Sequence, residues 1–294
     1  MNTIEIDRLT KDYGRGRGVF DLTFSVAQGE AFGFLGPNGA GKTTTIRHLM
    51  GFSRPQSGSC RIGGLDCLTQ SPRIQKDLGY IPGEIALPDE MTGLEFLRFL
   101  ARYRGVSDFS RAEALMARFE LDPRGRIRRM SKGMKQKVGI VCAFMHDPAV
   151  LVLDEPTSGL DPLMQNRFIE LVLEEKARGK TILLSSHMFE EVERTCDRVG
   201  ILRQGKLAAV EGVDRLKADR RRTYVVSFES EGEAAAFAAD APGVKGARGR
   251  RVTVEVAGPF GPFTAALARH PVTGLEEVRL TLEELFLHYY GEGK

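Results

Sequence analysis

Apolar and polar residues alternate along the first part of the chain in the way that half-buried strands require. Residues 3–9 and 19–26 follow this pattern, and the second segment has the sequence VFDLTFSV. The turn between them is YGRGRG. A third strand is expected at residues 30–35, where an apolar run leads directly into a glycine-rich stretch and then a helical pattern. The chain therefore begins with strands rather than helices.

Helical spacing replaces this alternation in the middle of the chain. Residues 84–145 repeat apolar positions every three or four residues, as in LEFLRFLARYRG and RAEALMARFEL. A short apolar strand, AVLVLDEP, follows at 149–156, and such strands belong to parallel sheets that are covered on both faces. Helices and strands then alternate, with helices expected at 163–178 and 188–196 and strands at 180–185 and 198–205. This order predicts an α/β domain.

The pattern changes near residue 215. Residues 215–222, RLKADRRR, are basic and poor in apolar positions, which predicts a linker. Further strands are expected at 223–230, 250–258 and 275–281, and helices at 233–241, 262–270 and 281–290. We therefore expect a first domain at 1–215, with a helical subdomain at about 84–145, and a small α+β domain at 223–294.

Composition agrees with a folded globular protein. The chain has 294 residues, of which 42% are hydrophobic and 28% charged, which excludes a fully disordered or collagen-like chain. This length suggests about two domains. Lys and Arg number 42 and Asp and Glu 39, so the net charge is only +3. Such a balance gives no global reason to expect a nucleic-acid partner.

Membrane and cysteine signals are both weak. No apolar run approaches the roughly 20 residues that a transmembrane helix needs. The N-terminal sequence MNTIEIDRLT lacks the basic start and apolar core of a signal peptide. The cysteines form no CxxC pair and no cluster with histidine, which favours reduced thiols in a cytosolic protein: Cys60, Cys67, Cys142 and Cys196.

The strongest local signal is the sequence GPNGAGKTT at residues 36–44, which fits the pattern GxxxxGK[ST] between a strand and a helix. Glycines let successive backbone N–H groups curl around a polyphosphate, and the following helix offers its positive end. Lys42 adds a charge for the β- and γ-phosphates, and the Thr43 hydroxyl is a candidate Mg²⁺ ligand. The expected nucleotide-binding residues are Gly36, Pro37, Asn38, Gly39, Ala40, Gly41, Lys42, Thr43 and Thr44.

Two carboxylates follow the apolar strand near residue 150. Asp154 stands where a P-loop protein places its second contact to Mg²⁺, and we expect it to hold the ion through water. Glu155 points elsewhere and is placed to reach the water that attacks the γ-phosphate. Alone, this acidic pair is equally compatible with a solvated turn, but the phosphate-binding pattern upstream favours the catalytic interpretation.

Taken in order, these motifs resemble the nucleotide-binding subunit of an ABC transporter over about residues 1–215. Residues 36–44 match its Walker A motif, and residues 150–155 match its Walker B motif with the catalytic glutamate. Tyr13 matches the aromatic residue that stacks on adenine. The other matches are MSKGMKQK at 130–137 with the signature, 158–161 with the D-loop, and His187 with the switch histidine.

The resemblance implies a P-loop NTPase fold of ABC type and an ATP hydrolase that uses ATP and Mg²⁺. Two copies would bind two ATP molecules head to tail, with Ser131 and Gly133 of one copy at the γ-phosphate held by the other. Asp161 would link the two sites, and His187 would hold the catalytic glutamate and water in line. The catalytic residues implied in this way are Lys42, Glu155 and His187.

The resemblance also implies the partners. A homodimer formed through ATP would drive a separate transmembrane permease, which places the chain peripherally at the cytoplasmic face of the cell membrane. The cargo would be chosen by the membrane subunit. No nucleic-acid partner is expected.

Two positions depart from the family pattern. Gly83 occupies the place of the Q-loop glutamine and is followed by Glu84, a candidate substitute. In the signature, Lys132 replaces a glycine and Met134 a glutamine. Together with the chain-ending TLEELFLHYY, these departures are similar to the ABC-2 export branch. The C-terminal domain resembles the accessory domain of that branch, which predicts a role in dimer contact or regulation.

Two other functions remain open at this point. One is a soluble ABC ATPase that acts on DNA or ribosomes, although the chain has neither a long coiled coil before the signature nor a second cassette. The other is a nucleotide-sensing module with little turnover, suggested by the missing glutamine at Gly83.

Overall fold

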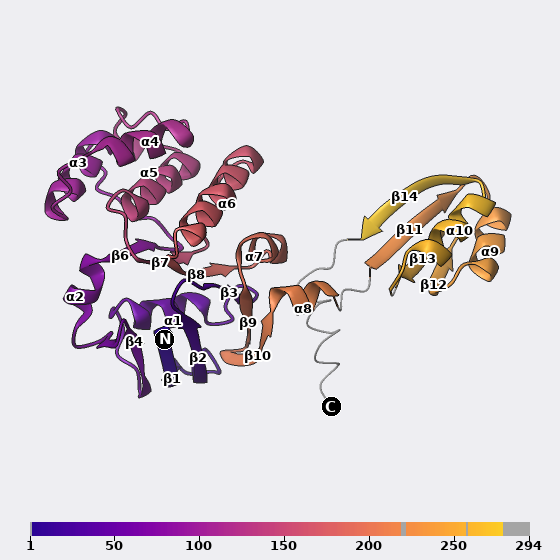
Figure 1. Ribbon diagram of the computed structural model, residues 1–294, viewed down its shortest axis with the longest axis horizontal. Helices are drawn as coiled ribbons and strands as arrows, with labels where there is room; N and C mark the ends of the chain where they lie inside the picture. The colour runs from indigo at the N-terminus through magenta and orange to yellow at the C-terminus, as the bar shows by residue number, and fades with distance from the viewer. Residues whose placement is uncertain (1, 219–221, 257, 279–294) are drawn as a thin grey trace. The chain divides into compact units, whose positions relative to one another are not determined.

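A computed structural model describes residues 2–218, 222–256 and 258–278 of the chain (Figure 1). The chain divides into two compact units, Met1–Val213 and Asp214–Lys294. Within the described residues, no helix combines the length and the apolar character that crossing a bilayer requires. All four cysteines lie in the described part of the chain and are free.

A six-stranded sheet forms the centre of the first unit. Every pairing is parallel except that of the edge strand β10 with β9. The strand β3 is buried throughout, as expected when both faces of a parallel sheet are covered. In sheet order the strands are β10 (Lys206–Gly212), β9 (Arg198–Arg203), β3 (Ala31–Leu35), β8 (Thr181–Ser186), β7 (Val150–Asp154) and β6 (Leu78–Ile81).

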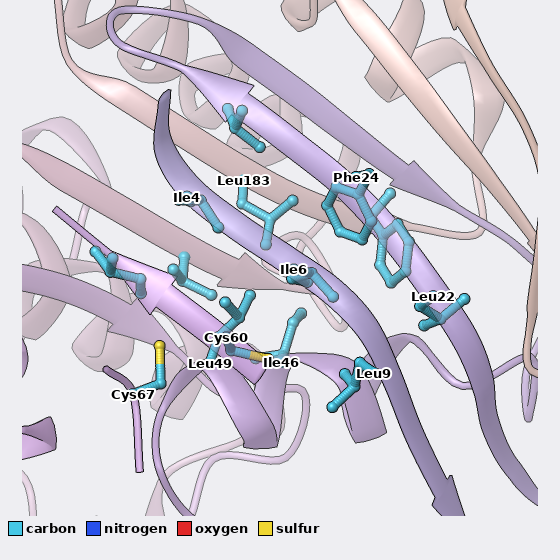
Figure 2. Packing of buried hydrophobic residues seen from close by; sticks show 14 of the residues in the cluster. Ile4, Ile6, Leu9, Leu22, Phe24, Ile46, Leu49, Cys60, Cys67 and Leu183 are labelled. Atoms are coloured by element: carbon cyan, nitrogen blue, oxygen red, sulfur yellow. The ribbon is translucent and has the colours of Figure 1, made fainter. Parts of the chain in front are cut away.

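An antiparallel sheet packs against this centre. Its order is β2 (Gly18–Ala27), β1 (Asn2–Asp12), β4 (Ser57–Ile62) and β5 (Leu65–Asp66). The core between the sheets includes Ile4 and Leu22, which are fully buried, and Leu183 from the parallel sheet (Figure 2). The ring of Phe24 stacks on the rings of Phe32 and Phe34, with centroids 5.1 and 5.2 Å apart. One apolar core therefore packs the two sheets against each other.

Helices account for the rest of the first unit. Their bounds are α1 (Lys42–Leu49), α2 (Ser71–Lys76), α3 (Gly93–Tyr103), α4 (Ser110–Arg118), the 3₁₀ turn η1 (Ile127–Arg129), α5 (Lys132–Phe144), α6 (Pro162–Ala177) and α7 (Phe189–Thr195). The helices α3, α4 and α5 lie together in Figure 1. Residues 84–92, expected to be helical, are not, and Pro88 disfavours helical geometry at the residue before it. Helix α3 begins with a capping box between Thr92 and Glu95.

The second unit has the order strand, helix, two strands, helix, strand. These elements are β11 (Arg222–Phe228), α9 (Glu231–Asp240), β12 (Val244–Arg248), β13 (Arg251–Val256), α10 (Gly261–Arg269) and β14 (Val272–Val278). The antiparallel sheet has the order β12-β13-β11-β14, which is the ferredoxin-like arrangement. Tyr224, Val226 and Phe228 alternate inward from β11 and pack in a core with Phe237 and Phe263.

Two details differ from the expectations for this region, and a third expectation is not tested. The strand β12 was not expected because its sequence, VKGAR, has no apolar alternation. The segment expected to be a linker begins within a helix, α8 (Val213–Ala218), in which Val213 and Leu216 are buried one helical turn apart. The helix expected at 281–290 and the last residues of the strand expected at 275–281 lie outside the described residues.

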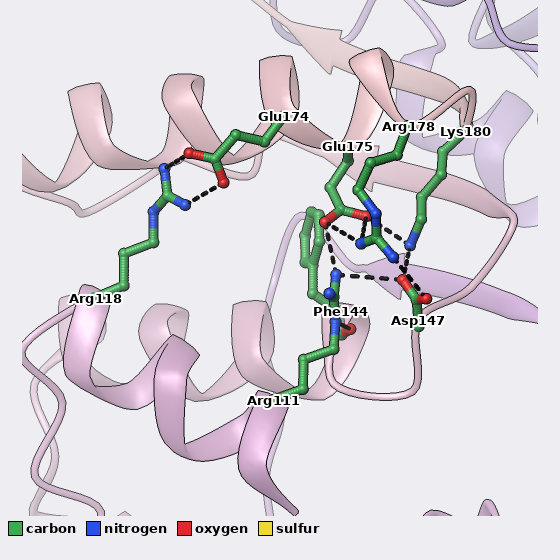
Figure 3. A network of polar contacts seen from close by, with 8 residues as sticks. All are labelled: Arg111, Arg118, Phe144, Asp147, Glu174, Glu175, Arg178 and Lys180. Atoms are coloured by element: carbon green, nitrogen blue, oxygen red, sulfur yellow. Dashed lines mark hydrogen bonds and ion pairs between the residues drawn. The ribbon is translucent and has the colours of Figure 1, made fainter.

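A buried polar network joins the helical part of the first unit to α6 (Figure 3). The Glu175 carboxylate is 3% exposed and lies 2.6 Å from Arg111 of α4, 2.6 Å from Lys180 and 3.0 Å from Arg178. Arg111 also donates to the carbonyl of Phe144, at 2.9 Å. Burial raises the pKa of Glu175, but Lys180 and Arg111 outweigh that effect, so the pKa is lowered. Glu175 is therefore ionised, and its carboxylate oxygens are paired with basic side chains.

Replacing Glu175 by Gln should destabilise the first unit by about 3 kcal/mol, because Lys180 and Arg111 would lose their buried counter-charge. The matched control is Glu174→Gln: Glu174 pairs with Arg118 on the surface and should cost only about 0.5 kcal/mol. Urea unfolding of the full chain measures both values. Equal losses in the two variants would contradict the role assigned to the buried network.

The same network predicts a pH dependence. Because the pKa of Glu175 is lower in the folded chain than its ordinary value of 4.5, its contribution is complete above that value and is lost as the pH falls through the folded pKa. The difference in unfolding free energy between the wild type and Glu175→Gln should therefore shrink in acid.

Candidate functional site

The loop between β3 and α1 is shaped to hold an anion. Gly39 and Gly41 have φ values of +81° and +110°, which favour glycine. A Cβ at Gly41 would lie 2.7 Å from Val19 Cγ1 and 3.1 Å from the carbonyl oxygen of Gly18, so a side chain does not fit there. No side chain of the described residues caps the N-terminus of α1, so its first N–H groups remain available to a ligand.

A cavity of about 900 Å³ opens over this loop. Of the residues expected to bind nucleotide, its wall contains Tyr13, Pro37, Asn38, Gly39, Gly41, Lys42, Thr43 and Thr44. Gly36 and Ala40 do not line it: Ala40 is buried, and the carbonyl of Gly36 accepts a hydrogen bond from Lys42. The volume is sufficient for a nucleoside triphosphate, which matches the size class of small-molecule sites.

Lys42 lies at the base of the cavity and is almost fully buried. Its ammonium donates to the carbonyl oxygens of Gly36 at 2.6 Å and Pro37 at 3.3 Å. It also lies 3.1 Å from Glu155 Oε1 in an ion pair. The phosphate-binding loop and the carboxylate after β7 thus meet at this one ammonium group.

Asp154 and Thr43 come together beside the loop. Asp154 is fully buried and accepts a hydrogen bond from the Ser185 hydroxyl, while its Oδ2 has no hydrogen-bond partner among the described residues. Burial raises the pKa of Asp154, and hydrogen bonds from Ser185 and Thr43 oppose that rise. A buried, unpartnered carboxylate oxygen next to a hydroxyl is the kind of hard oxygen donor set that Mg²⁺ prefers, so these residues fit the ion.

Glu155 and His187 also meet. Glu155 has a left-handed backbone conformation, φ +48°, in which its N–H bonds to both the carbonyl and the hydroxyl of Ser185, at 3.1 and 3.2 Å. His187, which follows β8, contacts Glu155 Oε2 through its Nδ1. The Glu155 carboxylate is therefore held between Lys42 and His187, and it lines the cavity.

Ser131, Gly133 and Asp161 do not line the cavity. They lie instead at the N-terminal ends of α5 and α6. Ser131 caps α5, and Asp161 caps α6 by accepting from Met164 N at 3.0 Å. A Cβ at Gly133 would lie 2.7 Å from the carbonyl oxygen of Gly159, so the start of α5 packs tightly on the 158–161 segment. Lys132, the departure from the family signature, donates to the Ser158 hydroxyl at 3.0 Å.

Several residues of the site were not identified from the sequence. Arg47 of α1 and Tyr80 of β6 line the cavity and are such residues, and Gly83 and Glu84, which the sequence had already singled out, line it too. Gly83 lies so close to the Walker B aspartate that a Cβ would be 3.0 Å from Asp154 Oδ2. No local sequence pattern identifies Tyr80, because its proximity to the loop depends on the order of strands in the sheet.

Comparisons with known proteins place the chain in a family. The family described as ABC transporter matches residues 19–158. The linearmycin resistance ATP-binding protein LnrL of Bacillus subtilis is 37% identical over 212 residues, which are 70% of this chain and 68% of that protein. The chain belongs to the ABC transporter family. The Nod factor export ATP-binding protein I of Paraburkholderia xenovorans is 39% identical, over 70% of this chain and 69% of that protein.

Solved structures agree. The structure of an ATP-binding subunit of an ABC transporter has a TM-score of 0.66 and 37% sequence identity, and covers 73% of this chain and 92% of that one. A dimeric bacterial ABC transporter cassette has a TM-score of 0.65 at 21% identity, covers 71% of this chain and 98% of that one, and shows the fold alone. The predicted P-loop fold of ABC type is confirmed.

The chain is thus an ATP-binding subunit of an ABC transporter and an ATP hydrolase. The resemblance to the export branch is confirmed as well, since relatives are named for export and for resistance. Neither alternative, a DNA- or ribosome-directed ATPase or a sensor with little turnover, is supported by these relatives.

Replacing Gly41 by Ala should weaken nucleotide binding by about tenfold or more, because the added methyl group must displace Val19 or the backbone of Gly18 and so distorts the loop. Gly39→Ala is the control, since its φ is also positive but nothing lies within 4 Å of the added Cβ. Titration with a fluorescent ATP analogue measures both. Equal affinities in the two variants would show that the close approach at Gly41 does not shape the loop.

Proposed function

We propose that the chain binds Mg²⁺-ATP over the 36–44 loop and works as one of two copies whose ATP hydrolysis drives export through a separate membrane permease. The observation that supports this best is the contact of Lys42 with Glu155 and of Glu155 with His187, directly at the phosphate-binding loop. Lys42, the proposed charge for phosphate, and Glu155, the proposed base, both line the cavity, and His187 contacts Glu155 from outside that lining.

The loop supplies the binding. The backbone N–H groups at the start of α1 face the phosphates, and Lys42 offers its ammonium to the β- and γ-phosphates. Tyr13, half exposed in the cavity wall, offers a ring face to the adenine. When bound through Thr43 and Asp154, Mg²⁺ would neutralise charge that develops on the phosphate oxygens.

Glu155 supplies the base. A polyphosphate competes with Glu155 for the Lys42 ammonium, and loss of this ion pair frees Glu155 Oε1 to accept a hydrogen bond from the attacking water. Glu155 then takes the proton of the attacking water while the water oxygen forms its bond to the γ-phosphorus and ADP leaves. His187 keeps the carboxylate oriented through Oε2.

The second copy follows from the residues that lie outside the cavity. Ser131 and Asp161 are exposed, and the N-terminus of α5 begins at Ser131, where the helix dipole favours an anion. We infer that this surface contacts the γ-phosphate held by a partner copy, so that nucleotide joins the two. Shifting a dimer from mostly open to mostly closed takes about 5.5 kcal/mol of differential binding.

The permease and the direction of transport rest on the relatives. Proteins named for Nod factor export and linearmycin resistance share 39% and 37% identity with this chain. We propose that this chain likewise powers export, bound to a permease at the cytoplasmic face of the membrane. The cargo would be selected by that permease.

Replacing Glu155 by Gln should leave ATP binding intact but slow hydrolysis by about 10² to 10⁴-fold, because the amide cannot accept the proton. The variant should accumulate as a dimer with Mg²⁺ and ATP and remain a monomer with ADP. Light scattering after size exclusion and a phosphate-release assay measure the two properties. Near-normal turnover would refute the base, and a monomer under all conditions would refute the shared site.

The second unit is proposed to support dimer contact or regulation. Deleting residues 223–294 should leave the ATP cavity intact, since its lining residues all belong to Met1–Val213. ATP-dependent dimerisation of the deletion variant in the Glu155→Gln background should weaken. Unchanged dimerisation and unchanged transport would together exclude such a role.

A further inference from the structure

One buried acidic residue near the site has no part in the chemistry described so far. Glu191 lies in α7, four residues after His187, and is 3% exposed. It does not line the nucleotide cavity. Its Oε1 is buried without a well-formed hydrogen bond among the described residues. Burying a carboxyl group is costly unless it is neutral or well partnered, so its presence here needs an explanation.

Hydrogen bonds connect Glu191 to the residues on both sides of His187. The Ser186 hydroxyl donates to Glu191 Oε2 at 2.6 Å, and the same hydroxyl oxygen accepts from the N–H of Met188 at 2.9 Å. Ser186 is the last residue of β8, and Met188 precedes α7. The Ser186 hydroxyl therefore links the two residues that flank His187, and it is itself held by the buried Glu191 carboxyl group.

Burial favours the neutral form of Glu191. Burial raises the pKa of Glu191 to about 7; the hydroxyls of Ser186 and Thr157 oppose the rise, the charge of Glu155 adds to it, and His187 opposes it. The Cys196 thiol also interacts with Glu191, but burial raises the pKa of that thiol to about 12, so it carries no charge. A neutral carboxyl group can lie near Glu155 without repelling it.

We propose that Glu191 is a positioning residue for ATP hydrolysis, which holds the 186–188 segment through Ser186 and so sets His187 against Glu155. This inference rests on the proposed catalytic roles of Glu155 and His187. Because Glu191 acts behind the cavity wall, its loss should disturb the geometry of the reaction more than the binding of ATP.

Four variants of the full chain test the proposal. Glu191→Ala removes the carboxyl group. Ser186→Ala removes the hydroxyl that bonds to both Glu191 and Met188. Glu191→Gln keeps a hydrogen-bonding group of the same shape that does not titrate. Glu190→Gln is the matched control, an acidic residue at the adjacent and exposed position of α7. Ser186→Ala keeps the test valid should Glu191→Ala fail to fold.

Steady-state phosphate release separates the outcomes. At about pH 6, Glu191→Ala and Ser186→Ala should lower kcat by about tenfold to a hundredfold with KM for ATP within about twofold, since a small displacement of reacting groups has effects of this size. Glu191→Gln should restore kcat to within about threefold of the wild type, and Glu190→Gln should match it. Ala variants that turn over normally, or a Gln variant as slow as the Ala variant, would overturn the proposal.

The pH profile provides a readout that a purely structural residue would not change. In the wild type, Glu191 ionises as the pH rises through about 7 and then places a second negative charge near Glu155. The ratio of kcat for Glu191→Gln to kcat for the wild type should therefore rise between about pH 6 and pH 8.5. A ratio that does not change with pH would contradict the assignment.

Thermal unfolding without nucleotide gives an independent check. The folded chain keeps a proton on Glu191 that the unfolded chain releases above about pH 4.5, so wild-type stability falls as the pH rises from about 4.5 to 7. The gain in Tm from Glu191→Gln should therefore be larger at about pH 8 than at about pH 5.

Absence of hydrolysis in the wild type would refute the proposed function, whereas active wild type with unaffected variants would refute only the role of Glu191.

Discussion

The ion pair between Lys42 and Glu155 is the interaction on which the site depends, because it joins two parts of the chain that are more than a hundred residues apart in sequence. The ammonium is also held by the carbonyl oxygens of Gly36 and Pro37, so it is fixed to the phosphate-binding loop. A lysine ammonium is a donor only, so a polyphosphate bound at the loop would compete with Glu155 for it. In the proposed function, phosphate binding and release of Glu155 would then be two consequences of one exchange.

The order of strands explains why this pair can form. The strand β8 lies between β3 and β7, so the loops that follow these three strands open on one edge of the sheet. Lys42 follows β3, Glu155 follows β7 and His187 follows β8, and ligands of open α/β sheets bind at such an edge. The stacked rings of Phe24, Phe32 and Phe34 hold β3 against the antiparallel sheet. The position of the 36–44 loop, which follows β3, is thereby fixed relative to that sheet.

What the sequence predicts well is local. The 36–44 loop, the acidic pair at Asp154 and Glu155, and His187 each stand next to the end of a strand, and period and motif identify them without any knowledge of contacts. The α/β class and the strands β3, β7 and β8 follow from the same periodicities, whereas β4, β5 and β10 were not expected. The strand β12 was not predicted either, because its pairing with β13, rather than its own composition, makes it a strand.

What the sequence does not predict is pairing between distant residues. All charged residues in the segment 124–137 are basic, yet Arg126 lies 3.4 Å from Glu90 and Lys135 lies 3.7 Å from Asp89. In the sequence, Glu175 cannot be told from the surface acidic residues of its helix. The structure shows that it is buried and paired with Lys180 and Arg111. Glu191 has the same appearance, since no motif distinguishes it from Glu190.

The contacts of α5 extend the argument from the site to its control. This helix begins at Ser131, on the surface proposed to meet the partner copy, and one turn later Gln136 donates to the carbonyl oxygen of Pro156 at 2.7 Å. Pro156 is the residue directly after Glu155. Because Gln136 is buried and its bond is buried too, α5 cannot turn about its axis without breaking that bond or moving the backbone that carries the base. If a partner copy contacts the N-terminus of α5 as proposed, this hydrogen bond would link that contact to the backbone beside Glu155.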